Sequence, residues 1–400
     1  MRACWAIAVA ILLSTPAAWC APLEDAEHPS LDKTQAAAAS RPWYQSLSLS
    51  GFLNAGYAQT GSASALPAGH FYVAERRFGA ALFVDADVST HVRVFTEIQL
   101  KAMALILVES YLHFPDLFPD TRQDLLSVKV GRFEIPFGEE YVWQDAIANP
   151  LILRTAAWPW AFDEGIELFG SLGRFGWVAA VTDGALSATA DDKGDKALTL
   201  KAHATPVDPL YVSLSFYRNG RAATSPFWID EVPTTPVGST VAAGGASTSP
   251  NAGLTALELD AKVDLGGGSG LSANYGLIEV SDIRPYRRTM DYFFVQVIVA
   301  LSPTHYLAGR GSSVSVHDGK GYRLGGDYNG AHTFASGGKT LFDTRSVQRL
   351  EVGTGYWPHP SVLLKASVAW DWVRFLDGTS APNPKSKDRW FAGGEIVVKF

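Results

Sequence analysis

Charged residues recur at every second position in several long segments of the chain. In the segment 257–265, Glu258, Asp260, Lys262 and Asp264 alternate with apolar residues. Residues two apart in a β-strand point to the same face, so these four side chains share one polar face. Rows of charged groups that line a water-filled passage select ions by sign. This spacing therefore predicts the handling of ions and small polar solutes.

Other segments repeat the pattern, and their charged residues extend the polar face. The candidate pore-lining residues are Arg93, Glu97, Lys101, Lys129, Lys201, His203, Glu258, Asp260, Lys262, Asp264, Arg349, Glu351, Lys365 and Asp371. Because both signs are present, we expect weak ion selectivity. His203 is expected to be a pore-lining or surface residue, not a metal ligand.

Motifs for covalent chemistry are missing from the sequence. There is no Gly-x-Ser-x-Gly elbow, no His-Glu-x-x-His pair and no phosphate-binding loop followed by a helix. Both cysteines, Cys4 and Cys20, lie in the first twenty residues. A formal net charge of −7 and the absence of a long basic stretch argue against nucleic acid as a partner. We predict no enzyme activity, no cofactor and no metal.

The first residues have the features of a cleaved secretory signal. Arg2 precedes an apolar run at 6–13, and small residues suited to a cleavage site occupy positions 18 and 20. We expect 1–20 to be a signal peptide, 21–45 a periplasmic N-terminal segment and 46–400 a single domain.

That domain is expected to be all-β, because no stretch approaches the ~18 consecutive apolar residues of a membrane helix. Its alternating segments reach about ten residues, which is the length that a tilted strand needs to cross a bilayer. A chain of this kind can span a membrane only as a closed barrel. We predict a transmembrane antiparallel β-barrel of about sixteen strands, with short periplasmic turns and long external loops. The expected strands are 47–60, 71–86, 91–101, 107–114, 125–135, 163–172, 175–184, 196–206, 210–219, 254–265, 270–281, 290–301, 304–316, 346–357, 361–375 and 388–400.

The C-terminus supports this prediction. Phe400, Val398, Ile396 and Trp390 fall on one alternating face of the last segment. This resembles the C-terminal assembly signal of outer-membrane proteins, and it implies recognition of Phe400 by the barrel assembly machinery.

A second resemblance lies in the middle of the chain. The segment Gly131–Gly138 (GRFEIPFG) is similar to a strand-end motif of the phosphate-selective porin O/P family. Asp163–Gly170 and Thr182–Gly184 resemble the hairpin that follows it. The resemblance is clearest over 125–184, and it implies a sixteen-stranded homotrimer whose third external loop narrows the lumen.

In this chain, residues 138–162 occupy the place of that constriction loop. Its charged candidates are Glu139, Glu140, Asp145 and Arg154; the alternative is a surface loop without a gating role. The family's anion selectivity depends on lumen-facing Lys and Arg, whereas this chain is acidic overall, so the solute is left open.

The sequence thus favours an outer-membrane porin for passive diffusion of small hydrophilic solutes or ions. Anions such as phosphate are among the solutes that such a porin could pass. Outer-membrane lipid and lipopolysaccharide are its expected surroundings, in a bacterial outer membrane. Two alternatives stay open: an outer-membrane enzyme that acts on lipid, and a non-conducting structural barrel.

Overall fold

The alternating segments form strands in the computed structural model. It describes residues 46–62, 68–73, 79–101, 104–118, 124–140, 146–157, 159–160, 162–184, 196–219, 228–229, 253–281, 287–317, 344–375 and 386–400. The strands are β1 (Ser48–Ser62), β2 (Ala68–Val73), β3 (Ala80–Ser89), β4 (Val92–Lys101), β5 (Ala104–Phe114), β6 (Ser127–Glu134), β7 (Pro159–Trp160), β8 (Phe162–Leu172), β9 (Phe175–Thr182), β10 (Ala197–Val207), β11 (Leu210–Arg218), β12 (Trp228–Ile229), β13 (Gly253–Gly266), β14 (Ser269–Ser281), β15 (Arg287–Ser302), β16 (His305–Val316), β17 (Thr344–His359), β18 (Val362–Phe375) and β19 (Ser386–Lys399). Within these residues, no helix is long and apolar enough to cross a membrane.

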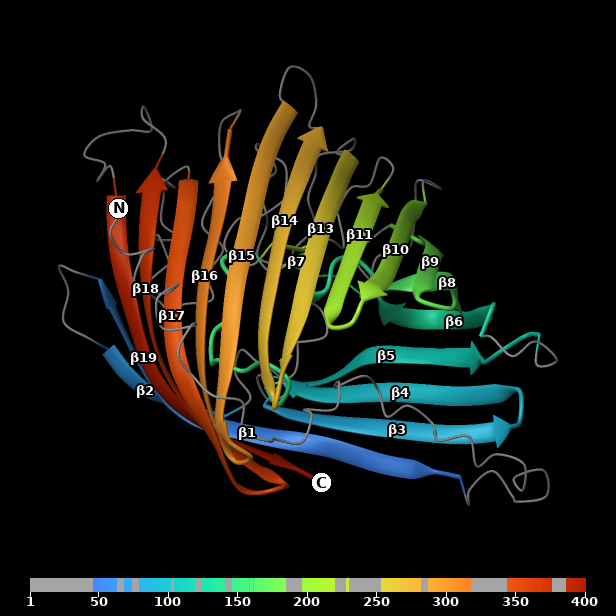
Figure 1. Cartoon of the computed structure of the whole chain (residues 1–400), viewed down its shortest axis with the longest axis horizontal. Coiled ribbons are helices and arrows are strands. Elements are labelled where there is room, and N and C mark those ends of the chain that lie inside the picture. Colours follow the sequence, from blue (N-terminus) through green and yellow to red (C-terminus); the bar gives the residue numbers. More distant parts are fainter. Residues whose placement is uncertain are drawn as a thin grey trace.

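The large sheet closes on itself into an antiparallel barrel. One edge of β1 pairs with β19, and its other edge pairs with β2 along Ala55–Thr60 and with β3 along Ser48–Leu53. β2 and β3 therefore share one strand position, which gives sixteen positions around the barrel. In Figure 1, β3 to β5 run at a steep angle to β13 to β16, as expected for tilted strands on different walls.

All sixteen expected strands are present in the barrel, with ends that differ by a few residues. The second expected strand, 71–86, differs from the others because the structure divides it into two separate strands, β2 and β3. β7 and β12 pair only with each other and stand outside the barrel sheet.

The two faces of the strands differ in polarity as the alternation predicts. On β13, Leu257 and Leu259 are 42% and 55% exposed on the outside, whereas Glu258 and Asp260 are at most 1% exposed. The outer side chains on the other strands are also mainly Leu, Val, Ile and aromatic residues. An apolar outer belt around a polar interior is the arrangement that a barrel needs in a lipid bilayer.

The connections differ strongly in length between the two ends of the barrel. At one end, two-residue turns join β3 to β4, β8 to β9, β10 to β11, β13 to β14, β15 to β16 and β17 to β18. At the other end, long links follow β6, β11 and β16. We call these the turn end and the loop end.

The last residue helps to close the barrel. Phe400 N–H donates to the Gly51 carbonyl, and Gly51 N–H donates to the Phe400 carbonyl, both at 3.0 Å. The backbone of the terminal residue thus continues the β1–β19 seam.

Candidate pore and its inward-folded loop

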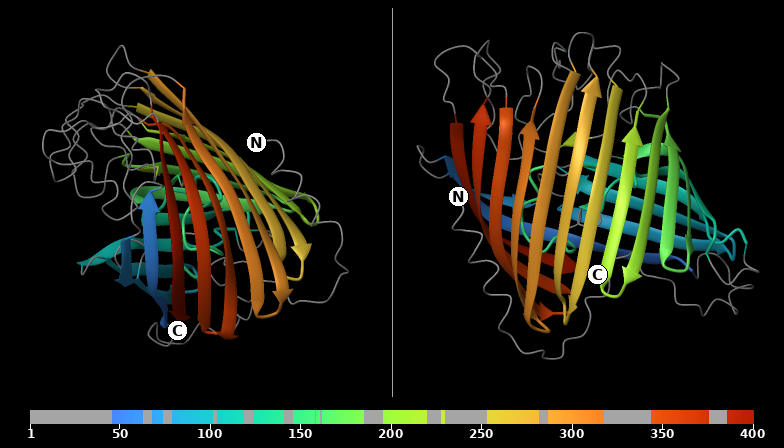
Figure 2. Two further views of the ribbon diagram at one scale, coloured as in Figure 1. Left: turned by 90° about the vertical axis from the view of Figure 1, so that its left-hand side faces the viewer. Right: turned by 45° about the horizontal axis from the view of Figure 1, so that its top comes forward.

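The link between β6 and β8 turns into the barrel. Its described residues 135–140 and 146–157 are buried or half-buried, and they contact inner side chains of strands that are distant in sequence. In Figure 2 the green trace of this link passes within the ring of strands. We name residues 138–162 the inner loop.

Apolar contacts hold both parts of this link against the wall. Phe137, together with Ile135 before it, packs in a cluster with Tyr217 of β11 and Ile278 of β14. Leu151 packs in a second cluster with Phe52 of β1 and Leu363 of β18. Ile152 and Leu153 form a third cluster with Ala369 and Phe391. The inner loop therefore covers the inner face of the wall from β10 to β19 and reaches β1.

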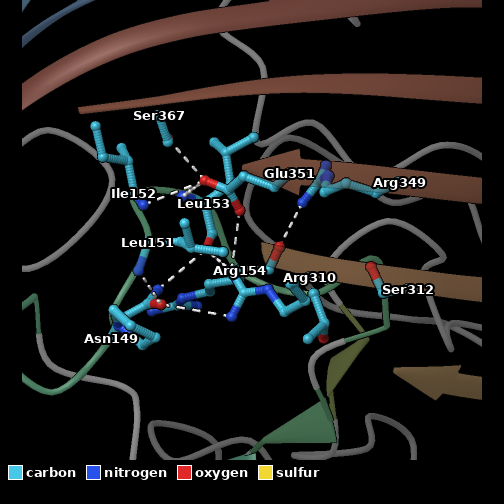
Figure 3. Close-up of polar contacts among 12 residues, drawn as sticks. Asn149, Leu151, Ile152, Leu153, Arg154, Arg310, Ser312, Arg349, Glu351 and Ser367 are labelled. Atoms are coloured by element: carbon cyan, nitrogen blue, oxygen red, sulfur yellow. Dashed lines mark hydrogen bonds and ion pairs between the residues drawn. The ribbon is translucent and has the colours of Figure 1, made fainter. Parts of the chain in front are cut away.

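Glu351 of β17 is the centre of the polar attachment (Figure 3). The backbone N–H groups of Ile152 and Leu153 donate to its Oε1 at 3.2 and 2.8 Å, and Ser367 also donates to that oxygen. Arg310 of β16 lies 3.0 Å from its Oε2, with both side chains fully buried. One carboxylate thus accepts bonds from the loop backbone and from a buried guanidinium.

Neighbouring cations bind carbonyl groups of the same loop. Arg349 Nη1 donates to the Arg154 carbonyl at 2.7 Å, while its other nitrogens pair with Asp371. Lys365 donates to the carbonyls of Ala146, Asn149 and Leu151, and pairs with Glu395 at 2.8 Å. The Arg154 side chain is buried as well. These cations therefore position the loop, as well as balancing the carboxylates of the wall.

The start of the inner loop has its own ion-pair group. Glu139 lies 2.6 Å from Lys201 and 2.7 Å from Lys262, and Tyr211 donates a hydrogen bond to it. Burial raises the pKa of Glu139, but the two ammonium groups outweigh burial and lower this pKa to about 2. Glu139 is therefore ionised at neutral pH, and Lys201 also donates to the Gly138 carbonyl.

The wall on the side of β3 to β8 carries the other candidates. Arg93 pairs with Asp85, and Lys129 pairs with Glu167 at 3.1 Å and lies over the rings of Tyr111 and Phe169. Arg93 and Lys129 keep 16% and 25% of their side-chain surface exposed, so they contact solvent more than Lys201 does at 3%. Lys262 keeps 31% of its side-chain surface exposed, so these three partly exposed cations are better placed to meet a solute than Lys201.

The remaining candidates occupy varied positions. Glu97 is buried and accepts a hydrogen bond from Gln99, and the half-buried His203 lies against the ring of Tyr211. Asp264 is exposed at the turn end, where it accepts a bond from Gly266. The side chain of Lys101 and the whole of Asp145 lie outside the described part of the chain.

Several residues of the site have no counterpart among the sequence candidates. Arg310 is the main one. The others are Asn274, which donates to Glu140, Tyr292, which donates to Glu258, Arg389, which pairs with Asp371, and Glu395, which pairs with Lys365. Alternation would place Arg310 on the inner face of 304–316, but Gly309 and Gly311 leave the apolar face of that segment weakly marked. Its pairing with Glu351 depends on strand register, which the structure supplies.

Gly138 makes a testable contact at the start of the loop. Its φ is +69°, and a Cβ at this position would overlap the Glu258 carboxylate. We expect Gly138→Ala to lower the free energy of unfolding by more than the roughly 1–2 kcal/mol of left-handed backbone strain alone. Chemical unfolding of the refolded protein measures this.

Gly173→Ala is the matched control, because Gly173 has φ +62° and open space around its Cβ position. Equal losses in the two variants would show that Glu258 does not pack against Gly138.

Among the described residues, no group of three or more His, Cys, Asp or Glu side chains is arranged to hold a metal ion. The carboxylates of the site are held by lysine, arginine, hydroxyl, amide and backbone donors.

The closed sheet, its sixteen positions and its apolar exterior define an outer-membrane type of β-barrel. No protein-family model matches the chain, and no curated protein matches its sequence. The resemblance to the phosphate-selective porin O/P family is therefore not confirmed, and the similarity that is shown is one of fold.

Solved structures with a similar fold come from several bacteria. OmpT, an outer membrane protein of Vibrio cholerae, covers 88% of this chain and 97% of its own, with 12% identity and a TM-score of 0.57. The outer membrane channel DcaP of Acinetobacter baumannii covers 90% and 100%, with 11% identity and a TM-score of 0.57. Pseudomonas putida OprB covers 89% and 95%, with 10% identity and a TM-score of 0.53.

Proposed function

We propose that this protein is an outer-membrane porin through which small hydrophilic solutes or ions diffuse passively. The observation that carries the proposal is the inner loop, which is fixed to one wall of a sixteen-stranded barrel by Glu351, Arg349, Lys365 and Lys201. A loop held in this way narrows a lumen without requiring a conformational change. Its solute preference then depends on the size of the remaining passage and on wall charge.

The wall charges support modest selectivity. Arg93 and Lys129 are each paired with a carboxylate, so neither presents an uncompensated charge. A mixed wall of this kind favours neither sign strongly. The proposal therefore extends to small ions in general, with anions such as phosphate as one case.

Location and assembly belong to the same proposal. The apolar outer belt fits a bilayer of outer-membrane lipid and lipopolysaccharide, and Phe400 is a suitable signal for the barrel assembly machinery. We also propose a homotrimer; a trimer form of Vibrio cholerae OmpT is among the solved structures of similar fold.

Planar-bilayer recording of the purified, refolded protein tests the proposal. We expect stepwise conductance with an ohmic current–voltage relation. Absent conductance together with lipid hydrolysis would instead support a lipid-acting enzyme. Absent conductance without hydrolysis would support a structural barrel.

Reversing the charge of Arg93 tests whether the β3–β8 wall borders the passage. Arg93→Glu places a third carboxylate beside Asp85 and Asp87 on the same inner face. In a tenfold salt gradient, we expect the reversal potential to move toward the cation limit of about 59 mV by roughly a tenth to a quarter of that value.

Arg374→Glu is the control, since Arg374 lies at the loop-end rim in a partly exposed pair with Asp388. An unchanged potential in Arg93→Glu would mean that this side chain does not border the permeation path.

A further inference from the structure

Three carboxyl groups meet where the inner loop begins. Glu140 belongs to the loop, and Glu258 and Asp260 belong to β13; all three are at most 1% exposed. Asn274 Nδ2 of β14 donates to Glu140 Oε1 at 3.1 Å and to Glu258 Oε1 at 3.2 Å. Two of these groups thus converge on a single amide. We name Glu140, Glu258 and Asp260 the carboxyl cluster.

Neutral side chains donate hydrogen bonds to the carboxyl cluster. Thr155 donates to Glu140 Oε2 at 2.5 Å, Tyr292 donates to Glu258, and Ser213 donates to Asp260 Oδ2 at 3.0 Å. The second oxygen of Asp260 is buried and has no hydrogen-bond partner within the described structure.

The nearby cations are held by other carboxylates. Lys201 and Lys262 pair with Glu139, and Arg310 pairs with Glu351. The charged and titratable groups that surround Glu140 are Glu139 and Arg154 of the loop, Lys201 of β10, Tyr211 of β11, Glu258, Asp260 and Lys262 of β13, Tyr292 of β15, Arg310 of β16 and Glu351 of β17.

Three carboxyl groups that meet in a buried site cannot all be ionised without a large electrostatic cost. Burial raises the pKa of Glu140 to about 7, against smaller opposing effects of the Thr155 hydrogen bond and the charge of Arg310. At neutral pH and below, Glu140 therefore carries its proton for much of the time.

We propose that a proton held in the carboxyl cluster keeps Glu140 of the inner loop on the wall, and that its loss at mildly alkaline pH loosens this contact and lets the loop at Glu140 move into the lumen. The inference rests on the proposed porin function, because it assigns pH regulation to the same constriction. It also concerns a contact between loop and wall that exists whether or not the barrel conducts.

The direction follows from the charges. As the pH rises, the carboxyl cluster loses its protons, and the carboxylates that form in this buried site repel one another, so the contact of Glu140 with the wall weakens. The distal part of the loop stays attached through Glu351 and Lys365. Glu139 also stays paired with Lys201 and Lys262. The loosened loop at Glu140 can therefore move only within the lumen, where it obstructs the passage.

Hydrogen–deuterium exchange of the refolded full chain tests the release directly. After correction for intrinsic rates, we expect amides of 135–140 and 146–157 to exchange faster at about pH 8 than at about pH 6. The ionised fraction of a group that titrates near 7 rises about tenfold over this interval. We expect Glu140→Gln to abolish this increase, and Glu258→Gln serves as a second variant if Glu140→Gln fails to fold.

Single-channel recording provides the second readout. Brief closures of the wild type should become about tenfold more frequent over the same pH interval, and those of Glu140→Gln should stay constant. Glu164→Gln is the matched control: Glu164 pairs with Arg132 and is 46% exposed, so this variant should respond to pH like the wild type.

Equal pH responses of exchange in the wild type and in Glu140→Gln would overturn the inference, as would wild-type exchange that does not respond to pH. A protein that never conducts, yet shows the Glu140-dependent change in exchange, would refute the porin function and leave the proton-held contact intact.

Discussion

Glu351→Ala is expected to lower the free energy of unfolding by about 3–5 kcal/mol, because it removes one partner of a buried ion pair. The variant leaves the Arg310 guanidinium without its carboxylate and removes the acceptor of two loop amides, those of Ile152 and Leu153. Guanidinium unfolding of the protein refolded in lipid vesicles measures the loss. The freed loop should also make the single-channel current unsteady.

Glu164→Ala is the control, since a partly exposed ion pair contributes only ~0–1 kcal/mol. Glu351→Gln keeps an acceptor oxygen while it removes the charge, so its loss should fall between those of the two alanine variants. If Glu351→Ala unfolds like Glu164→Ala, Glu351 does not hold the loop.

Val352→Arg is expected to have the second large effect, a loss of about 2–4 kcal/mol. Val352 lies near the middle of β17, is 51% exposed, and points outward beside the inward-facing Glu351. A charge there would face hydrocarbon if the outer belt contacts lipid. Unfolding from vesicles measures the cost.

Leu301→Arg makes the same change at the turn end of β15, where Leu301 is 61% exposed. Near the membrane surface the cost should fall to roughly 0–1 kcal/mol. Equal costs at the two depths would argue that no bilayer surrounds the barrel.

The architecture could be predicted from sequence because alternation is a local property. Each strand such as 257–265 shows its own apolar and polar faces, and two-residue turns mark the boundaries. The second strand was harder to predict, because two separate strands, β2 and β3, pair with a single edge of β1.

The attachment of the loop could not be predicted in the same way. Glu139 and Arg154 were candidates because of their charge and position, but their partners Lys262 and Arg349 lie 123 and 195 residues away in the sequence. Such partners depend on register around a closed barrel, which also pairs Arg310 with Glu351 and Lys365 with Glu395. The sequence also could not indicate that Lys201 is buried beneath the loop backbone.

The signal peptide at 1–20 and the segment 21–45 lie outside the described residues, so both stay predictions. The sequence leaves the solute open, with anions such as phosphate as one case, and the comparisons show similarity of fold alone.

The two-faced barrel wall is most directly tested by spin labels at successive positions of β13. Labels at Leu257, Glu258, Leu259 and Asp260 in the refolded protein can be probed with oxygen, which partitions into lipid, and with a water-soluble nickel chelate. We predict high oxygen accessibility at Leu257 and Leu259 and low oxygen accessibility at Glu258 and Asp260. Uniform accessibility along the four positions, or the reverse alternation, would contradict a barrel whose outer face contacts lipid.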